Sequence, residues 1–532
     1  MVEIFSNALT WTLLLPVIGG VIALLVPEKV ARWAALLFTL ATFAVTIGVF
    51  VNILATGGFG GFGDLAHPQF EVKVAWIHFV ANSLQFNVDY HLGVDGLSMP
   101  MVLLNALLTV LAVIGGWKKM RVREYMALLL LLEAGVMGVF ISLDLFLFFL
   151  MWEVELAPMF LLIGIWGSDT MKHGMPGRIY SAWKFLLYTF FGSIFMLAGI
   201  LLLYFMVGQQ TGTYDASIAY LSQHLVSGDI SVLGITVGAQ LLIFLLIFMA
   251  FAVKIPMFPF HTWLPDAHTD APTEVSVILA GVLLKMGAYG LIRICLSVAP
   301  AGAQAFAPWM AVIAAINILY GAAICLAQTD MKKLIAYSSV SHMGVILLGV
   351  AAAASGLGGP DFRMAALTGA VVQMFSHGII TGMLFFCVGV IYDHAHTREI
   401  AAFGGVAKRM PLLATLFTFA GLASLGLPGL AGFIAEYMTF TSSYASWPVV
   451  TVVSVFTMIL TAAYLLWMLK RVFYGPFNPR WDWLPDANVR ESIPLIVLAV
   501  LIVIVGIYPP ILVDVITPTL QALMHGFGVA IK

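Results

Sequence analysis

Residues 241–260 read LLIFLLIFMAFAVKIPMFPF, an apolar run long enough to cross a lipid bilayer that nevertheless contains Lys254. A second apolar run, VSVILAGVLLKMGAYG at 275–290, contains Lys285 in the same way. A charged side chain at the centre of a membrane helix costs roughly 2.5–3.5 kcal/mol on insertion scales, so such a lysine is expected to have a partner and a function. The two runs therefore predict membrane-spanning helices that carry ionisable groups inside the bilayer.

The composition excludes a soluble globular protein. Of the 532 residues 62% are hydrophobic and only 9% are charged, and the mean hydropathy is +1.04. A soluble fold cannot bury so much apolar surface, so we expect an all-α membrane protein that crosses the bilayer about 14 times. The apolar runs with the length of a transmembrane helix lie at 8–26, 31–53, 96–115, 125–142, 144–166, 183–207, 236–260, 273–296, 304–327, 331–354, 363–391, 411–437, 448–470 and 492–513.

The distribution of basic residues predicts the orientation. An even number of spans places both termini on one side of the membrane, and 18 of the 24 Lys and Arg residues then fall in the connections of the opposite side. Positive charge is enriched on the cytoplasmic side of membrane proteins, so both termini are expected to face outward. The net charge of -2 offers no basic surface for a nucleic-acid partner.

The whole chain, 1–532, is expected to form a single membrane domain built around two inverted repeats. Proline or glycine interrupts the apolar runs at 252–260 and again at 424–436, and each break has an ionisable residue beside it, Lys254 or Glu436. Such breaks in corresponding positions of two halves are typical of transporters with inverted repeats, so each five-helix repeat should contain one discontinuous helix. The predicted parts are N-terminal helices in 1–120 with an outer-face hairpin in 54–95, a first repeat in 121–300, a second repeat in 301–475, and a C-terminal loop and helix in 476–532.

Glu153 is the predicted partner of Lys254. It lies in LFLFFLMWEVELAPMFLLIGIW, about 14 Å into its span at helical rise and so near the middle of a ~30 Å hydrocarbon core. A buried Glu/Lys pair can switch between charged and neutral forms, because burial and the partner's charge act on each group in opposite directions. Glu155 is a weaker candidate, since two positions along a helix point to different faces. Glu133, also mid-span, is an auxiliary candidate that would supply protons to Glu153.

Lys285, His342, His377 and Glu436 extend this pair into a predicted proton relay. The two histidines lie in the middle of consecutive spans, between Lys285 and Glu436 in chain order. Imidazole exchanges protons near neutral pH, so two such histidines favour proton transfer from Lys285 toward Glu436, the predicted exit site, over two unrelated structural hydrogen bonds. Arg293 lies toward the end of its span and is expected to reach the membrane surface.

The segment HTWLPDAHTDAPTE leaves an alternative of another class open, a membrane-embedded metal hydrolase built on His261, Asp266, His268 and Asp270. The spacing of these residues matches no common zinc motif, so no metal site is predicted, and a loop that caps the cytoplasmic mouth is the preferred interpretation. His261 remains an auxiliary candidate for proton transfer. The three cysteines form no motif for an iron–sulfur cluster.

Four stretches of the chain resemble the antiporter-like membrane subunits of respiratory complex I and of the related multi-subunit sodium/proton antiporters. They are KIPMFPFHTWLPDAHTDAPTEVSVILAGVLLKMGAYGLIR at 254–293, DMKKLIAYSSVSHMG at 330–344, FSHG at 375–378 and GLPGLAGFIAEYM at 426–438. The first is long enough to be highly specific. Glu436 stands where other members of the family carry lysine.

The resemblance implies a proton-translocating subunit in the membrane arm of NADH-quinone oxidoreductase, located in the bacterial inner membrane. Glu153 and Lys254 would form the first-half charge pair, Lys285 the central relay and Glu436 the exit-half site. The chain would take part in the enzyme as a subunit and bind no cofactor itself, since NADH, FMN, iron–sulfur clusters and quinone would belong to partner subunits. Neighbouring antiporter-like subunits and membrane lipids would be its contacts. A subunit of a sodium/proton antiporter remains the alternative within transport.

Overall fold

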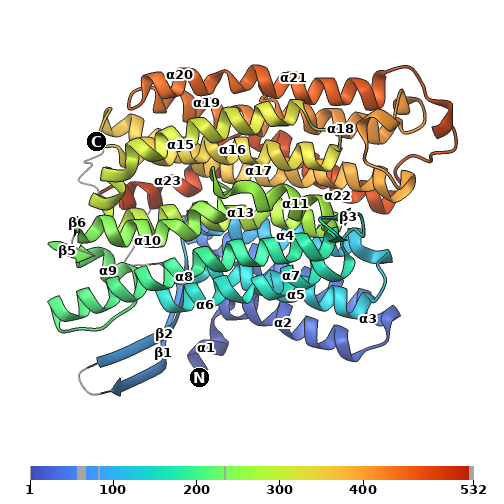
Figure 1. The fold of residues 1–532 in the computed structure, drawn as a ribbon. Helices are drawn as coiled ribbons and strands as arrows, with labels where there is room; N and C mark the ends of the chain where they lie inside the picture. The colour runs from blue at the N-terminus through green and yellow to red at the C-terminus, as the bar shows by residue number, and fades with distance from the viewer. Residues whose placement is uncertain (1, 57–67, 82–83, 233–234, 526–532) are drawn as a thin grey trace.

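The computed structural model describes residues 2–56, 68–81, 84–232 and 235–525, and Figure 1 shows them as a slab of long, roughly parallel helices. The N-terminal helices lie at one edge of the slab, and α20 and α21 at the other. Within the described residues twelve helices are long and apolar enough to cross a membrane, and the shorter apolar helices 239–254 and 411–424 lie among them. The predicted all-α membrane architecture is confirmed.

The first part of the chain contains α1 (Val2–Ser6), α2 (Ala8–Leu25), α3 (Glu28–Ala55), α4 (Met99–Gly115), α5 (Val122–Ile141), α6 (Leu145–Val154), α7 (Leu156–Trp166), α8 (Gly177–Thr211), α9 (Ile218–Gln223), α10 (Ala239–Lys254), α11 (Trp263–Asp270), α12 (Thr273–Ile278), α13 (Leu284–Gly290) and α14 (Leu296–Val298). The second part contains α15 (Pro300–Leu326), α16 (Met331–Ala354), α17 (Pro360–Ala395), α18 (Pro411–Ser424), α19 (Ala431–Ser443), α20 (Pro448–Val455), α21 (Thr457–Leu469), α22 (Val489–Ile507) and α23 (Pro510–His525). The strands are β1 (Gln69–Ala81), β2 (Leu84–Val94), β3 (Met171–Lys172), β4 (Met175–Pro176), β5 (Asp229–Val232) and β6 (Ile235–Gly238).

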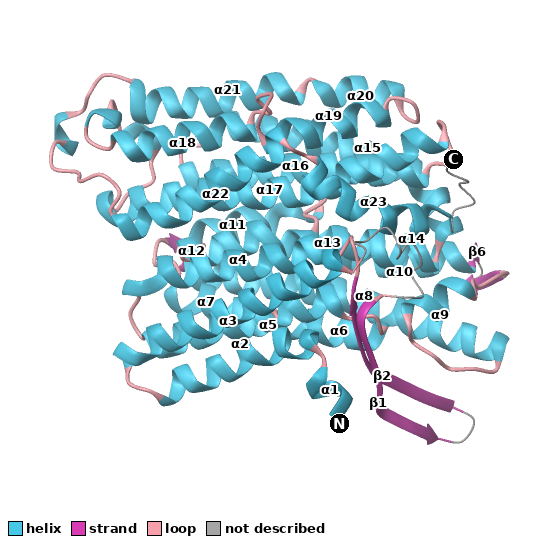
Figure 2. Cartoon of the chain, turned by 180° about the vertical axis from the view of Figure 1, so that it is seen from behind, coloured by secondary structure: helices cyan, strands magenta, loops and turns pink. Residues whose placement is uncertain are grey.

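The strands expected before the third span are present. β1 and β2 pair antiparallel, with Lys73 opposite His91, and Figure 2 shows this hairpin projecting from the helical body. The remainder of the predicted hairpin region, 57–67, lies outside the described residues. The pairs β3–β4 and β5–β6 are short antiparallel ladders in helix connections that the periodicity of the sequence does not predict.

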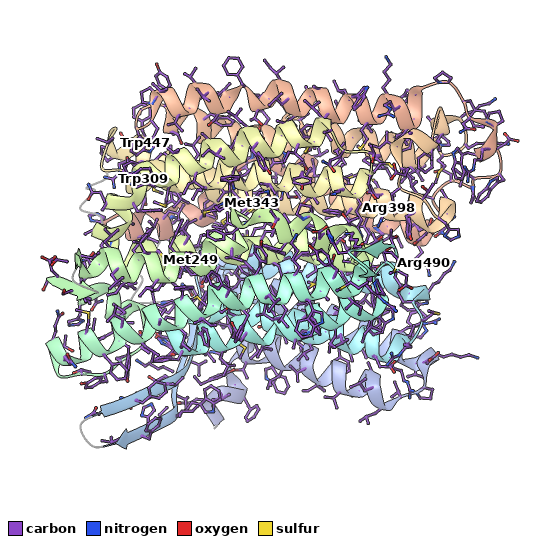
Figure 3. The ribbon with its side chains drawn as sticks, in the orientation of Figure 1. Met249, Trp309, Met343, Arg398, Trp447 and Arg490 are labelled. Carbon is purple, nitrogen blue, oxygen red and sulfur yellow. The ribbon has the colours of Figure 1, made fainter. Side chains whose placement is uncertain are left out.

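Charged residues and tryptophans lie at the ends of the helices, as expected for a protein that crosses a membrane. Figure 3 places the labelled Arg398 and Arg490 at one end of the slab, and Trp309 and Trp447 near the other. Side chains fill the interior between the two ends, where Met343 is fully buried. Charged groups at the ends and tryptophans near an interface are the usual arrangement of a bundle that spans a bilayer.

Both predicted helix interruptions are present. α10 ends at Lys254, and the chain continues through Pro256 and Pro259 before α11 begins. A proline within a helix lacks the N–H donor and clashes with the preceding turn, so backbone groups are left to be satisfied by other residues. Asn317 of α15 does this: its side chain accepts a hydrogen bond from the Phe258 N–H at 2.7 Å and donates one to the Pro256 carbonyl at 3.3 Å.

The second interruption separates α18 from α19 at residues 425–430, which include Pro428. The two helices approach closely at Gly432, where a Cβ atom would lie 2.2 Å from the Ala423 carbonyl oxygen. Two further irregularities were not predicted. The fifth apolar run is broken at Glu155, between α6 and α7, and π-helical turns at 279–283 and 291–295 flank α13, which carries Lys285.

Asp144 joins the hairpin to the helices. It caps α6 by accepting hydrogen bonds from the N–H groups of Phe146 and Leu147 at 2.9 and 3.0 Å, and it accepts a third from the Asp89 N–H of β2 at 3.3 Å. Its side chain is nonetheless buried, and burial raises the pKa of Asp144 from 3.8 to about 6, although these hydrogen bonds act in the opposite direction.

A pH-dependent contribution of Asp144 to stability is expected. An acid whose pKa is higher in the folded state stabilises that state below pH 3.8 and loses this contribution as the pH rises through about 6. The loss amounts to at most about 3 kcal/mol. The D144N variant lacks the titration, so its thermal midpoint relative to wild type should rise between pH 4 and pH 7. A difference that stays constant with pH would contradict the assignment.

Candidate functional site

Lys254 forms a buried ion pair with Glu155. Its Nζ contacts Oε1 of Glu155, and both side chains are withdrawn from solvent. The ammonium group also lies 5.2 Å from the centre of the Trp152 ring and 5.6 Å from that of Phe185. Aromatic faces attract a cation most strongly where water is excluded, so they add to the ion pair in holding Lys254 in place.

The prediction that Glu153 is the partner of Lys254 was therefore wrong. Glu153 and Glu155 lie on different faces, as their spacing requires, and the break between α6 and α7 turns Glu155 toward Lys254. Glu153 is half-buried and lines a pocket of about 400 Å³ together with Trp76, Ile77 and Val88 of the hairpin.

Lys285 lies beside His377 of α17, whereas the order of the sequence would place His342 next to it. Its Nζ is 2.6 Å from Nδ1 of His377 and also donates a hydrogen bond to the Ala280 carbonyl in the adjoining π-helical turn. Among the described residues no carboxylate forms an ion pair with Lys285. Two neighbouring bases without a counter-charge cannot easily both be protonated in a low-dielectric interior, so they can share one proton.

His342 and Glu436 continue the line on the other side of His377. The ring centres of His342 and His377 are 5.5 Å apart, and Nδ1 of His342 lies 3.2 Å from Oε1 of Glu436. The other ring nitrogen of His342 is 3.3 Å from the Ser424 hydroxyl, at the end of α18. Lys285, His377, His342 and Glu436 thus form an unbroken row of titratable groups from four different helices.

Between this row and Lys254 the helices are in close contact but the charged groups are not bonded to each other. Gly287 of α13 makes the approach possible, because a Cβ atom there would lie 3.0 Å from the Cβ of Lys254. Glu133 of α5 is completely buried, and neither of its carboxyl oxygens has a partner among the described residues. An isolated carboxyl of this kind needs a bound proton or water, so Glu133 remains an auxiliary candidate for proton transfer.

His268 and Lys332 are two candidates that the sequence analysis did not assign to the relay. His268 is completely buried, its ring is stacked 4.7 Å from Phe385, and neither ring nitrogen has a partner among the described residues. It lies within electrostatic reach of both Lys285 and Lys332. Two features of the sequence could have identified these residues as candidates. His268 comes soon after the predicted helix break, and Lys332 lies in the first turn of a span that begins at Met331.

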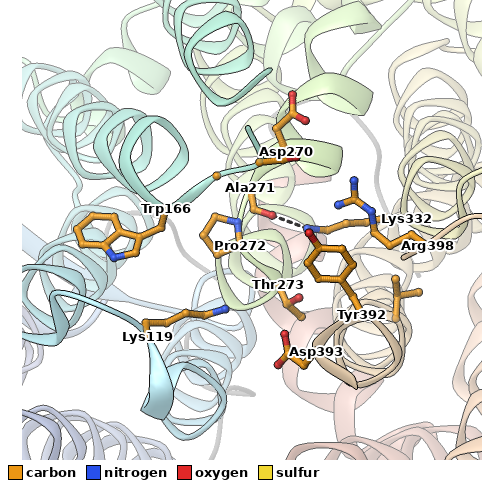
Figure 4. A pocket seen from close by; sticks show the side chains of 13 residues that line it. Lys119, Trp166, Asp270, Ala271, Pro272, Thr273, Lys332, Tyr392, Asp393 and Arg398 are labelled. Carbon is orange, nitrogen blue, oxygen red and sulfur yellow. Dashed lines mark hydrogen bonds between the residues drawn. The ribbon is translucent and has the colours of Figure 1, made fainter. Parts of the chain in front are cut away.

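A pocket of about 110 Å³ lies next to Lys332 at the end of the slab that carries Arg398 (Figure 4). Lys119, Asp393 and Arg398 also line it, and the Lys332 ammonium donates a hydrogen bond to the Ala271 carbonyl at 2.5 Å. The pocket is large enough for a few water molecules. We call it the inner basin, and it connects this face of the protein to Lys332.

The four residues of the metal-hydrolase alternative do not converge. Asp266 and Asp270 both accept hydrogen bonds from Lys172, at 3.1 and 2.8 Å, which ties β3 to α11. Burial opposes the charge of Lys172, but these bonds and the two carboxylates hold its pKa above the usual value. His261 faces the Tyr320 ring instead, 5.1 Å between ring centres. Among the residues described here, no group of three or more His, Cys, Asp or Glu side chains is arranged to hold a metal ion.

The expectation that Arg293 reaches the membrane surface was wrong. It is buried and forms an ion pair with Asp95, at the beginning of the third span. The Tyr289 ring lies 5.6 Å from its guanidinium group.

These observations define a class: helical membrane proteins with a row of interacting ionisable groups inside the bilayer region. Residues 142–461 match the family described as NADH:quinone oxidoreductase/Mrp antiporter, transmembrane. The chain belongs to this family, which confirms the resemblance seen in its motifs.

Relatives in sequence cover almost the whole chain. Subunit M of the NADH-quinone oxidoreductase of Rhodobacter capsulatus is 42% identical over 94% of this chain and 91% of its own length. Chain 4 of the NAD(P)H-quinone oxidoreductase of Gloeobacter violaceus is 37% identical over 97% and 92%.

Solved structures agree with this assignment. A chain of respiratory complex I from Thermus thermophilus with bound NADH has a TM-score of 0.81 and 28% identity, with 98% of this chain and 100% of that chain covered. A chain of the Mrp complex from Dietzia sp. shares the fold, with a TM-score of 0.77, 21% identity and 99% of both chains covered.

Proposed function

We propose that this chain is a proton-translocating membrane subunit of a NADH-quinone oxidoreductase. The observation that carries the proposal is the row of Lys285, His377, His342 and Glu436, in which Lys285 contacts His377, the centres of the two histidine rings lie 5.5 Å apart and His342 contacts Glu436. The redox reaction belongs to other subunits of the complex, which hold FMN, the iron–sulfur clusters and the quinone site. The names of the relatives support a place in such a complex, since this chain is similar to subunit M and to chain 4 of these oxidoreductases.

The proposed mechanism couples the row to the Lys254 ion pair. When the site around Lys254 loses negative charge, the change acts on Lys285 through the closely packed contact at Gly287 and drives the proton of Lys285 toward His377. His342 then accepts the proton and passes it to Glu436, which releases it outward. The inner basin, Lys332 and His268 resupply Lys285.

The proposed architecture is a bundle of 14 spans with two inverted five-helix repeats in 121–300 and 301–475. The two helix breaks support it, because each has an ionisable residue beside it: Lys254 lies directly before the break between α10 and α11, and Glu436 lies just after the break between α18 and α19. In the bacterial inner membrane the inner basin would face the cytoplasm, and both termini would face outward.

Neighbouring antiporter-like subunits are the proposed partners, and lipids would cover the remaining apolar sides. The β1–β2 hairpin supports a subunit contact, because Trp76, Phe79 and Val80 expose 50%, 52% and 67% of their surface on an element that projects from the body. Exposed apolar side chains of this size are characteristic of contact surfaces.

The K254M variant of the intact complex tests the function. Removing one member of a buried ion pair leaves the other charge unpaired, at a cost of roughly 3–5 kcal/mol, so NADH-driven proton uptake by inverted membrane vesicles should fall at least about tenfold. NADH oxidation with an artificial electron acceptor should be unchanged, because that reaction occurs in other subunits.

The K118M variant is the matched control, since it makes the same exchange at an exposed lysine. Normal proton uptake by K254M would refute the proposal. Sodium-dependent proton exchange without NADH would favour the sodium/proton antiporter instead.

A further inference from the structure

We propose that Glu153, Glu155 and Lys254 act as one three-group site that holds a single exchangeable proton, with Glu155 as the permanent counter-charge of Lys254 and Glu153 as the acid that exchanges. This inference rests on the proposed function and deepens it. It assigns to Glu155 a role that the predicted pair of Glu153 and Lys254 did not include.

Charge balance requires the additional proton. One ammonium and two carboxylates carry a net charge of -1, and all three groups lie close enough to interact electrostatically. Like charges in a poorly hydrated environment disfavour each other's ionisation, so one carboxyl retains a proton. The site then alternates between a neutral form with that proton and an anionic form without it.

The geometry decides which carboxylate is permanently charged. Glu155 contacts Lys254 directly and is fully buried, so its negative charge is compensated. Its backbone is held against α5 at Gly135, where a Cβ atom would lie 3.0 Å from the Glu155 nitrogen. The rings of Trp152 and Phe185 fix the ammonium group from the other side. Glu155 therefore has the position of a rigid counter-charge.

Glu153 has the position of the exchangeable acid. It is half-buried, forms no ion pair among the described residues, and lines the pocket of about 400 Å³ beside the hairpin. One of its carboxyl oxygens has no hydrogen-bond partner, and neither does the second oxygen of Glu155. The pocket is open to the outside of the protein, so a proton that leaves Glu153 passes to water that reaches its carboxyl from that side and returns the same way, while the nitrogen–oxygen contact of Lys254 with Glu155 remains.

The test compares E155Q and E153Q in the intact complex, with NADH-driven proton uptake and infrared difference spectra of carboxyl groups as readouts. The wild type should show a C=O band of a protonated carboxyl. The band should be absent in E153Q, and it should also be lost in E155Q, because Glu153 is then the one carboxylate left beside the Lys254 ammonium and ionises. Proton uptake should fall at least about tenfold in E155Q, as in K254M, and the E155K/K254E exchange should restore part of it by re-forming the pair.

Three results overturn the inference. They are normal uptake by E155Q, a carboxyl band that persists in E153Q, and an exchange variant that assembles but gives no recovery. In each case a loss of uptake in K254M would leave the proposed function standing, whereas normal uptake in K254M would refute both. The E155D variant, which keeps the charge, shows whether a loss in E155Q comes from the charge or from failed assembly.

Discussion

Replacing Lys285 by methionine is expected to abolish proton translocation through this chain. Lys285 contacts both His377 and the π-helical turn beside it, so the row loses its first group without it. Loss of a positioned proton-transfer group lowers a rate by roughly 10²–10⁴-fold. Proton uptake by vesicles that contain the intact complex, measured per NADH oxidised, would show the loss.

The K285R variant separates proton transfer from a purely electrostatic role. Arginine keeps the positive charge but does not release its proton in proteins, so it should fail as methionine does if Lys285 transfers protons. Uptake near the wild-type rate in K285R would instead make Lys285 a fixed charge. Assembly of both variants is checked by the yield of the complete complex.

Replacing Glu436 by glutamine is expected to have the next largest effect. The exchange removes the carboxylate that lies 3.2 Å from His342. Among the described residues, no other carboxylate forms an ion pair with Lys285, His377 or His342. Protons that reach His342 then lack their acceptor, so uptake should again fall by roughly 10²-fold or more.

The E28Q variant is the control for E436Q, because it makes the same exchange at an exposed position. The E436D variant should keep part of the activity, since it retains an ionisable group on the same helix. Equal and normal uptake in E436Q and E28Q would remove Glu436 from the proposed exit and end the row at His342.

Much of the fold could be predicted from the sequence, for a simple physical reason. In a bilayer every spanning segment must be apolar and must satisfy its own backbone hydrogen bonds. The local composition of the chain therefore predicts where the helices lie. The same constraint makes Lys254, Lys285 and Glu436 conspicuous, because an ionisable residue in an apolar run carries a cost. Both helix breaks were predictable from Pro256, Pro428 and their neighbours.

The membership of the row could be predicted from the sequence, but the contacts within it could not. Lys285, His342, His377 and Glu436 do come together, yet His377 lies beside Lys285 and His342 beside Glu436, the reverse of their order along the chain. Lys254 was assigned the wrong partner, because the fifth apolar run was treated as one continuous helix. Pro158 lacks the N–H that the Val154 carbonyl would accept in such a helix, and α6 ends at Val154. Glu155 therefore turns where a continuous helix would have kept it on another face.

By itself the sequence determined that this protein is a many-spanning membrane bundle with ionisable residues inside, because composition and charge spacing act locally along the chain. Only the tertiary structure decided which acid holds Lys254 and that His268 and Lys332 lie between the inner basin and Lys285. These depend on how helices distant in sequence approach one another. That approach follows from close-packed side chains and small residues such as Gly135 and Gly287, whose effect no local pattern records.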